Sequence, residues 1–266
     1  MKIPALIIER IENLLRRNSE DIYLHEPCFL ETNALEYLKD CIDSGWVSSS
    51  GKWVSKFENL IAKHTGSKNV IAVSNGTNAL RLSLFVLGVK PNEEVLIPPL
   101  SFVATANSVS HLGAYPHFVD IESKSLGMCP FALETRLNQI GLKKGDNVFN
   151  KITGKRIAAV IPVHIFGLPA DLLQIKKICT EWNLPIVEDA AEALGSKLSS
   201  SDQDLHCGSI GDLGILSFNG NKIITTGGGG AILTNSDQFA KLARHLSTTA
   251  KLAHQWEFIH DRVGWN

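Results

Sequence analysis

The sequence has little excess charge of either sign: 26 lysines and arginines stand against 27 aspartates and glutamates, with a formal net charge of -1 over 266 residues. This balance disfavours a nucleic-acid-binding protein, which usually carries a basic patch or a strongly basic domain. No apolar run approaches the ~20 residues that a membrane-spanning helix needs. Lys2, Glu9 and Arg10 interrupt the N-terminus, which therefore has no secretory hydrophobic region. We expect a cytoplasmic protein.

Cysteine is also scarce, since the five cysteines are odd in number, scattered and without a CxxC pair. A disulfide framework or a structural zinc is therefore disfavoured. The histidines at 111, 117 and 206 show no metal-ligand spacing. No GxGxxG motif follows a strand, so a plain Rossmann nucleotide binder lacks support. The 44% of hydrophobic and 20% of charged residues are typical of an ordinary globular protein.

Helices are predicted before residue 70. Apolar side chains at Leu6, Ile7 and Ile11 predict a short amphipathic helix over residues 5–17. Further helices are expected over residues 33–44 and 53–64, ended by Gly45 and Gly66.

From residue 70 onward, short apolar runs alternate with helical patterns of about ten residues. Strands are predicted over residues 70–73, 94–98, 117–120, 157–163, 184–187, 213–217 and 231–234. Helices are predicted over residues 78–87 and 102–112, and over residues 171–182 with Asp171 as the cap. The polar stretch 143–154 predicts a loop. The whole pattern indicates an α/β fold, with a mostly parallel seven-stranded sheet and helices on both faces.

Ligands of such sheets bind at the carboxyl ends of the strands. The residues that follow the predicted strands are therefore considered together: residues 74–77, Ser101 and Phe102, His164, Asp189, and residues 217–222. His164 could face a ligand there, although a histidine satisfied within the core is the more common outcome.

The turn Ser74-Asn75-Gly76-Thr77 lies between a strand and a helix. Gly76 permits close backbone approach, and the free amides of a helix N-terminus favour an anion. A phosphate could bind here, although the same turn could serve only as a helix cap.

Asp189 and Lys222 complete the pattern. Asp189 ends a buried strand and could be a helix cap or the partner of a ligand cation, because a buried carboxylate needs a partner. Lys222 could simply be solvated, but a lysine near a phosphate turn and a buried acid suggests a Schiff base to a phosphorylated aldehyde. Pyridoxal phosphate fits: phosphate on Gly76 and Thr77, the pyridine nitrogen on Asp189, and Phe102 over the ring face.

The chain resembles the DegT/DnrJ/EryC1/StrS aminotransferases, pyridoxal-phosphate enzymes that aminate nucleotide-linked keto-sugars. The resemblance covers about residues 23–266, and residues 1–22 form an N-terminal helical extension. Six segments occur in the family's order and at family-like spacing: residues 45–48, 74–80, 101–107, 167–171, 188–195, and 217–222 with the glycine run 227–230.

The resemblance implies roles for particular residues. Lys222 corresponds to the lysine that binds the cofactor covalently and moves the proton, and Asp189 to the partner of the pyridine nitrogen. Phe102 occupies the ring-stacking position, Gly76, Thr77 and Ser217 correspond to phosphate contacts, and Glu192 lies near the cofactor hydroxyl. Many members have histidine where this chain has Asn219. The terminal Asn266 corresponds to an asparagine that reaches the phosphate of the neighbouring subunit, which implies a homodimer with a shared active site.

The segment 219–230 is most similar to the branch that aminates C4 of UDP-linked 4-keto-6-deoxy-N-acetylhexosamines, with L-glutamate as the expected donor. That branch serves lipopolysaccharide or polysaccharide biosynthesis on routes to bacillosamine and legionaminic acid. The family's dehydratases carry histidine in place of Lys222, which argues against that activity. Family members usually continue into a small C-terminal domain that this sequence lacks. A truncated, non-catalytic remnant that keeps the fold is therefore the alternative.

Overall fold

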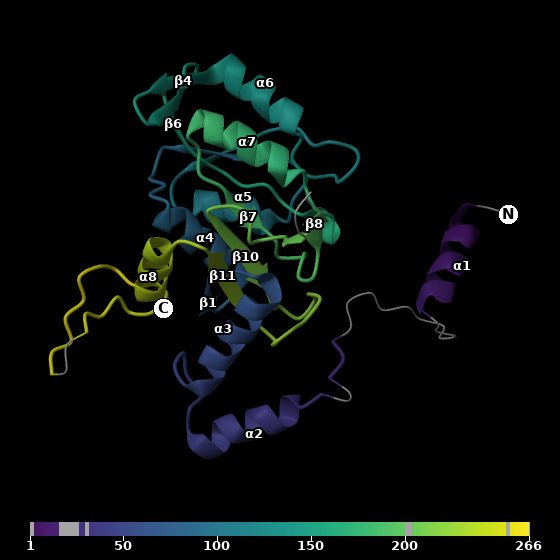
Figure 1. Ribbon diagram of the computed structural model, residues 1–266, viewed down its shortest axis with the longest axis vertical. Coiled ribbons are helices and arrows are strands. Elements are labelled where there is room, and N and C mark those ends of the chain that lie inside the picture. The colour runs from purple at the N-terminus through teal and green to yellow at the C-terminus, as the bar shows by residue number, and fades with distance from the viewer. Residues whose placement is uncertain (1–2, 16–26, 30–31, 200–203, 254–255, 266) are drawn as a thin grey trace.

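The computed structural model describes residues 3–15, 27–29, 32–199, 204–253 and 256–265. Two groups of strands, β1-β11-β10-β7 and β3-β2-β6-β5-β4, meet where bridges join Val160 to Ile186 and Val163 to Asp189. A seven-stranded sheet results, in the order β1-β11-β10-β7-β6-β2-β3. The strands β1, β11, β10 and β7 lie next to one another in the centre of Figure 1. The strands are β1 (Asn69–Val73), β11 (Gly230–Thr234), β10 (Leu213–Ser217), β7 (Val187–Asp189), β6 (Arg156–Val160), β2 (Glu94–Ile97) and β3 (Tyr115–Phe118). Among these seven strands, only β11 runs antiparallel to its neighbours, so the mostly parallel sheet is confirmed.

Helices cover both faces of this sheet, because successive strand residues point to opposite sides. In β1, Ile71 packs into the cluster formed with α4 (Gly76–Val86), α5 (Val103–Ser110) and α8 (Asp237–Leu246). Its neighbour Val70 faces α3 (Lys52–Thr65). On that second face, α6 (Pro130–Ile140) and α7 (Leu172–Trp182) cover Leu96 and Val160.

Helix ends follow local capping chemistry. The amide side chain of Asn75 accepts a hydrogen bond from the Asn78 backbone N–H at 2.8 Å, so α4 begins at Gly76, two residues earlier than predicted. The carboxylate of Asp171 accepts one from the Gln174 amide at 3.3 Å, as expected of the α7 cap. Gly45 and Gly66 adopt the left-handed conformation that ends α2 (Ala34–Ser44) and α3.

Several elements differ from the prediction. The polar stretch 143–154 is not a plain loop, because β4 (Gly141–Lys144) and β5 (Asn147–Asn150) form a hairpin that pairs with β6. Its lysines lie on an edge strand, where charge is common and hides the apolar pattern. A second hairpin, β8 (Lys197–Ser199) and β9 (Asp204–His206), was also missed, as were α6 and α8. The strand expected over residues 184–187 is instead β7, which carries Glu188 and Asp189.

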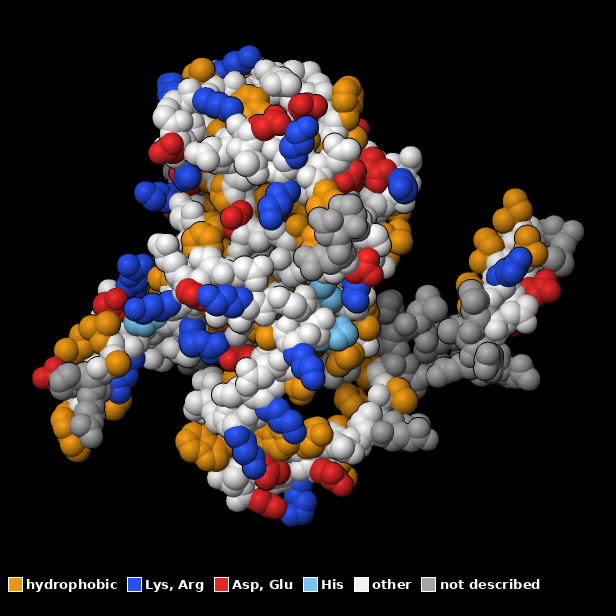
Figure 2. All heavy atoms as spheres, in the orientation of Figure 1, with side chains coloured by type: hydrophobic (Ala, Val, Ile, Leu, Met, Phe, Trp, Pro, Cys, Tyr) orange, Lys and Arg blue, Asp and Glu red, His pale blue; other side chains and the backbone are white. Residues whose placement is uncertain are grey.

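The helices α1 (Ile3–Leu15) and α2 leave apolar side chains exposed, among them Ile7, Leu35 and Ile42. Figure 2 shows hydrophobic surface on both helices and on the C-terminal segment that includes Phe258 and Val263. Within the described part of the chain, no helix is long and apolar enough to cross a membrane.

Glu94, at the start of β2, is buried in a polar cluster far from the carboxyl ends of the strands. Its carboxylate accepts hydrogen bonds from Thr153 Oγ1 (2.6 Å), Asn150 Nδ2 (2.9 Å) and His117 Nδ1 (3.0 Å). Arg136 Nε donates to His117 Nε2 at 2.9 Å, which places the ring proton on Nδ1, toward Glu94.

We expect Glu94→Ala to lower the free energy of unfolding by about 3 kcal/mol, because it leaves buried donors without an acceptor. Urea denaturation measures this change. Glu134→Ala, at an exposed position of α6, is the control and should change it by less than about 0.5 kcal/mol. Equal stability of the two variants would show that the Glu94 cluster does not stabilise the fold.

Candidate functional site

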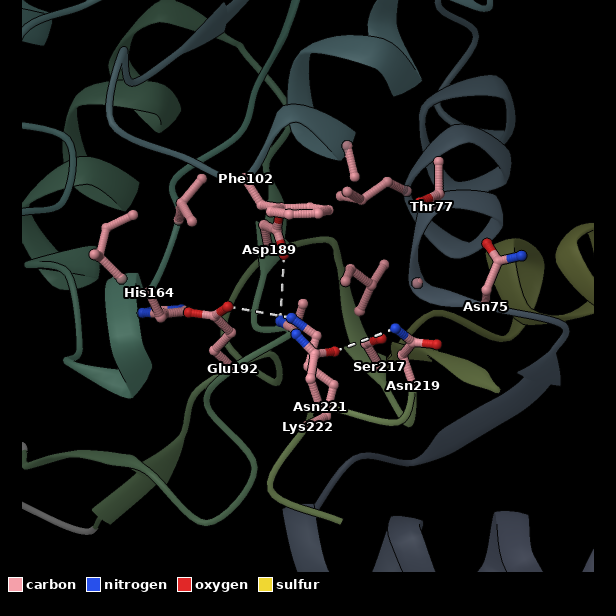
Figure 3. A pocket seen from close by; sticks show the side chains of 17 residues that line it. Asn75, Thr77, Phe102, His164, Asp189, Glu192, Ser217, Asn219, Asn221 and Lys222 are labelled. Carbon is pink, nitrogen blue, oxygen red and sulfur yellow. Dashed lines mark hydrogen bonds and ion pairs between the residues drawn. The ribbon is translucent and has the colours of Figure 1, made fainter. Parts of the chain in front are cut away.

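A cavity of about 310 Å³ lies at the carboxyl ends of β1, β7 and β10. It brings together eight of the residues predicted from the sequence: Gly76, Thr77, Phe102, Asp189, Glu192, Ser217, Asn219 and Lys222. Thr77 and Ser217 lie on one side of the cavity, and His164 and Glu192 on the other (Figure 3). Asn266 lies outside the described residues.

The side with Thr77 is formed by the first turn of α4 and the end of β10. Asn75 caps the Asn78 amide of this turn. The amides of Gly76 and Thr77 before it have no acceptor within the helix, and such amides favour an anion. A Cβ atom on Gly76 would stand 2.9 Å from Cβ of Ser217, closer than carbon atoms pack. Glycine is therefore what allows α4 to approach Ser217 and to present its amides to the cavity.

Asp189 ends β7 and is 5% exposed. Its carboxyl accepts hydrogen bonds from Thr105 Oγ1 at 2.7 Å and from the Ala191 amide at 3.2 Å. Burial raises the pKa of Asp189, whereas these hydrogen bonds and the charges of His164 and Lys222 lower it. A cation bound in the cavity would stabilise the carboxylate further.

Lys222 lies in the loop after β10, where its amide donates to the Asn219 carbonyl at 3.0 Å. Its side chain is 11% exposed, and Nζ donates to Glu192 Oε1 at 3.1 Å. Nζ also stands 5.6 Å from the centroid of the Phe102 ring. The other Glu192 oxygen accepts the Phe166 amide at 3.2 Å. A primary amine is thus held inside the cavity between a carboxylate and an aromatic ring.

His164 lines the cavity, where a ligand would lie, but it is 1% exposed and has hydrogen-bond partners within the core. Its Nε2 bonds Glu188 Oε2 at 3.1 Å, and its Nδ1 accepts the Ala170 amide at 3.1 Å. Burial opposes the imidazolium form, but hydrogen bonds to Cys207 and Glu188 raise the pKa of His164 to about 10. When Nδ1 accepts the Ala170 amide, the ring proton is on Nε2, which donates it to Glu188.

Four of the contributors that were not assigned a role from the sequence are Asn75, Ala191 and Asn221 in the cavity wall, and Thr105 beside Asp189. All four stand in segments already singled out by the resemblance. The sequence does not show where their side chains point. Thr105, for example, lies on α5 and contacts Asp189, which is distant in the sequence.

The arrangement suits a flat, phosphorylated carbonyl compound. It combines free helix amides for an anion, a buried acid for a ring cation, an aromatic face, and an amine that can add to a carbonyl. Among the described residues, no group of three or more His, Cys, Asp or Glu could hold a metal ion.

Comparison with known proteins adds independent findings. The model of the DegT/DnrJ/EryC1/StrS aminotransferase family matches residues 29–266. A GDP-perosamine synthase of Vibrio cholerae is 36% identical over 92% of this chain and 61% of its own length. A UDP-2-acetamido-2-deoxy-3-oxo-D-glucuronate aminotransferase of Pseudomonas aeruginosa is 32% identical over 86% of this chain and 60% of its own.

Among solved structures, a DegT/DnrJ/EryC1/StrS aminotransferase from Brucella abortus superposes with a TM-score of 0.76 at 30% identity. That match covers 87% of this chain and 58% of the other. The chain thus spans about three fifths of the length of the relatives it matches.

Proposed function

This chain belongs to the DegT/DnrJ/EryC1/StrS aminotransferase family, and on that premise we propose that it transfers an amino group to the keto group of a nucleotide-linked sugar. The observation that carries the proposal is the cavity itself, in which Lys222 Nζ, the buried Asp189 carboxyl and the first-turn amides of α4 converge. The family's cofactor is pyridoxal phosphate. It supplies an aldehyde that binds amines covalently and a ring that accepts electrons from the reacting carbon.

The residues present fit this cofactor. The cradle formed by Gly76 and Ser217 leaves no space for a Cβ, and the α4 amides there can bind the phosphate. Asp189 can hold a proton at the pyridine nitrogen, since a cation there offsets the burial that raises the pKa of this carboxyl. Phe102 can cover one ring face, and Glu192 and Asn219 can contact the polar edge.

Lys222 carries the covalent and proton-transfer roles in this proposal. Its Nζ is the primary amine that donates to Glu192 in the cavity, and it lies near the Phe102 ring that would cover the cofactor. When free, the same nitrogen can move a proton at the reacting carbon as base and then as acid. Leu80 and Ile215 add apolar surface to the cavity wall.

The phosphate cradle predicts a specific effect. Gly76→Ala should weaken pyridoxal phosphate binding at least about tenfold, because the added Cβ displaces α4 from Ser217 and misaligns its amides. Equilibrium dialysis measures the dissociation constant. Gly228→Ala is the control, since a Cβ there meets only one backbone oxygen, at 3.9 Å. Equal affinities for the two variants would exclude the α4 turn as the phosphate site.

For the substrate, we propose a UDP-linked 4-keto-6-deoxy-N-acetylhexosamine, with L-glutamate as donor and an amino sugar for surface polysaccharide as product. The support is the resemblance of segment 219–230 to the branch with that substrate. The name of the Vibrio cholerae relative favours a GDP-linked sugar as a second candidate.

A direct experiment compares UDP-linked and GDP-linked 4-keto sugars, each with L-glutamate and pyridoxal phosphate, and follows 2-oxoglutarate and the amino-sugar product by mass spectrometry. Product from the UDP-linked sugar alone supports our first choice, and product from the GDP-linked sugar alone replaces it with the second. Cofactor uptake without product from either would favour the non-catalytic alternative.

We also propose that residues 23–266 form the cofactor-binding domain, that residues 1–22 are an extension, and that two copies share the active site. The exposed apolar side chains of α2, including Leu35 and Ile42, support a surface that a second copy covers. Light scattering gives the mass in solution, and a monomer at micromolar concentration would refute the shared site.

A further inference from the structure

Glu188 is a fully buried carboxylate for which the cofactor chemistry has no direct use. It is 0% exposed and lies in β7 directly before Asp189. Successive strand residues point to opposite faces, so Glu188 projects away from the face to which Asp189 projects. A buried carboxylate is costly unless hydrogen bonds satisfy both of its oxygens.

Four donors satisfy Glu188 completely. Oε1 accepts the amides of Ile210 (2.6 Å) and Gly211 (2.5 Å), and Oε2 accepts the Gly208 amide (2.6 Å) and His164 Nε2 (3.1 Å). Gly208 has φ +93°, and a Cβ on Gly211 would meet Glu188 Cγ at 3.3 Å. The backbone around residues 208–211 is therefore shaped to surround this one carboxylate.

These contacts fix the strand end that carries Asp189. The His164 amide donates to the Asp189 carbonyl at 3.1 Å, and the Asp189 amide donates to the Pro162 carbonyl at 2.9 Å. The His164 side chain then joins the same segment to Glu188, and its Nδ1 is held by Ala170. Within the described part of the chain, the Asp189 carboxyl accepts two hydrogen bonds, from Thr105 and Ala191. The orientation of the Asp189 carboxyl therefore depends on the backbone segment that Glu188 holds in place through His164.

We propose that Glu188 is a positioning residue that, through His164 and the amides of residues 208–211, aims the Asp189 carboxyl into the cavity. The inference rests on the proposed role of Asp189 in binding the cofactor ring. Glu188→Gln tests it, because glutamine places an NH₂ group against amide donors where a carboxylate oxygen accepts them.

The first test uses the protein without cofactor. Asp189→Asn, which replaces the buried carboxyl with an amide, should raise the thermal unfolding midpoint at neutral pH. The size of that rise reports how firmly the wild-type carboxyl is kept buried. In the Glu188→Gln background we expect the rise to fall to less than half, because a loosened strand end lets the carboxyl turn toward water. The Glu94→Ala background, altered at the opposite end of the sheet, keeps the full rise. An undiminished rise with Glu188→Gln overturns the inference, whether or not the chain binds cofactor.

A second variant serves if Glu188→Gln does not fold. His164→Gln removes the rigid imidazole that links Glu188 to the Ala170 amide, and leaves the three amide donors to Glu188. With pyridoxal phosphate added, we expect about tenfold weaker binding and a shifted pH midpoint of the cofactor absorbance. Glu94→Ala should leave the cofactor affinity and the pH midpoint of the absorbance unchanged. Unaltered affinity and absorbance in His164→Gln contradict the inference, whereas a wild-type chain that takes up no cofactor defeats the proposed function and leaves the first test decisive.

Discussion

Lys222→Ala is expected to lower the rate of amino transfer at least about a thousandfold, because it removes the group that binds the cofactor covalently and moves the proton. The side chain is 11% exposed, and its Nζ donates to Glu192 inside the cavity. Non-covalent cofactor binding should survive in part, since the α4 amides and Asp189 remain. The measurement is 2-oxoglutarate formation from L-glutamate with a keto-sugar acceptor.

Two comparisons separate this role from a structural one. Lys177→Ala, at an exposed position on α7, should keep the wild-type rate. Adding methylamine to Lys222→Ala should restore part of the activity, because a small free amine can occupy the emptied position. Transamination by Lys222→Ala at the wild-type rate would remove Lys222 from the proposed mechanism.

Asp189→Asn is expected to slow amino transfer about a hundredfold or more, because an amide cannot balance the positive charge on the pyridine nitrogen in the transition state. The variant should keep its local hydrogen bonds, since the asparagine oxygen can accept from Ala191 and its NH₂ can donate to Thr105. The bound cofactor should therefore show altered absorbance while the fold is retained. A wild-type rate and spectrum would exclude Asp189 from its role.

The same substitution should stabilise the protein without cofactor at neutral pH. Burial raises the pKa of Asp189 above the unfolded value, so the native state binds the proton more tightly than the unfolded state. The free energy of unfolding then falls as pH rises from about 4 to the folded pKa, by about 1.4 kcal/mol for each pH unit in that window. Asp189→Asn lacks this loss. Its free energy of unfolding should therefore exceed that of the wild type in this pH window, and the difference should vanish below about pH 4. Unfolding at several pH values measures it.

The sequence could predict the sheet because its strands are short apolar runs between helical patterns. The strand over residues 213–217 matches β10 residue for residue. The strands are mostly parallel, and α4 and α7 lie on opposite faces of the sheet, as the alternation of strands and helices implies.

The remaining errors have physical causes. β7 contains Glu188 and Asp189, which apolar periodicity cannot assign to a strand, and it pairs with β10 because backbone amides satisfy the buried Glu188. The β4–β5 hairpin is short, with Lys143 and Lys144 on its edge strand. In the cavity, the positions of Gly76, Asp189 and Lys222 follow from their places after strands, but the contacts of Thr105 and His164 depend on packing between distant segments.

The central claim is that this cavity binds pyridoxal phosphate through Lys222. Borohydride reduction of the purified protein with added pyridoxal phosphate, followed by peptide mass mapping, tests it most directly. We predict one dominant pyridoxyl adduct, on Lys222, that inorganic phosphate competes away. A folded protein with no adduct, or with labelling spread over exposed lysines such as Lys177, would contradict the claim.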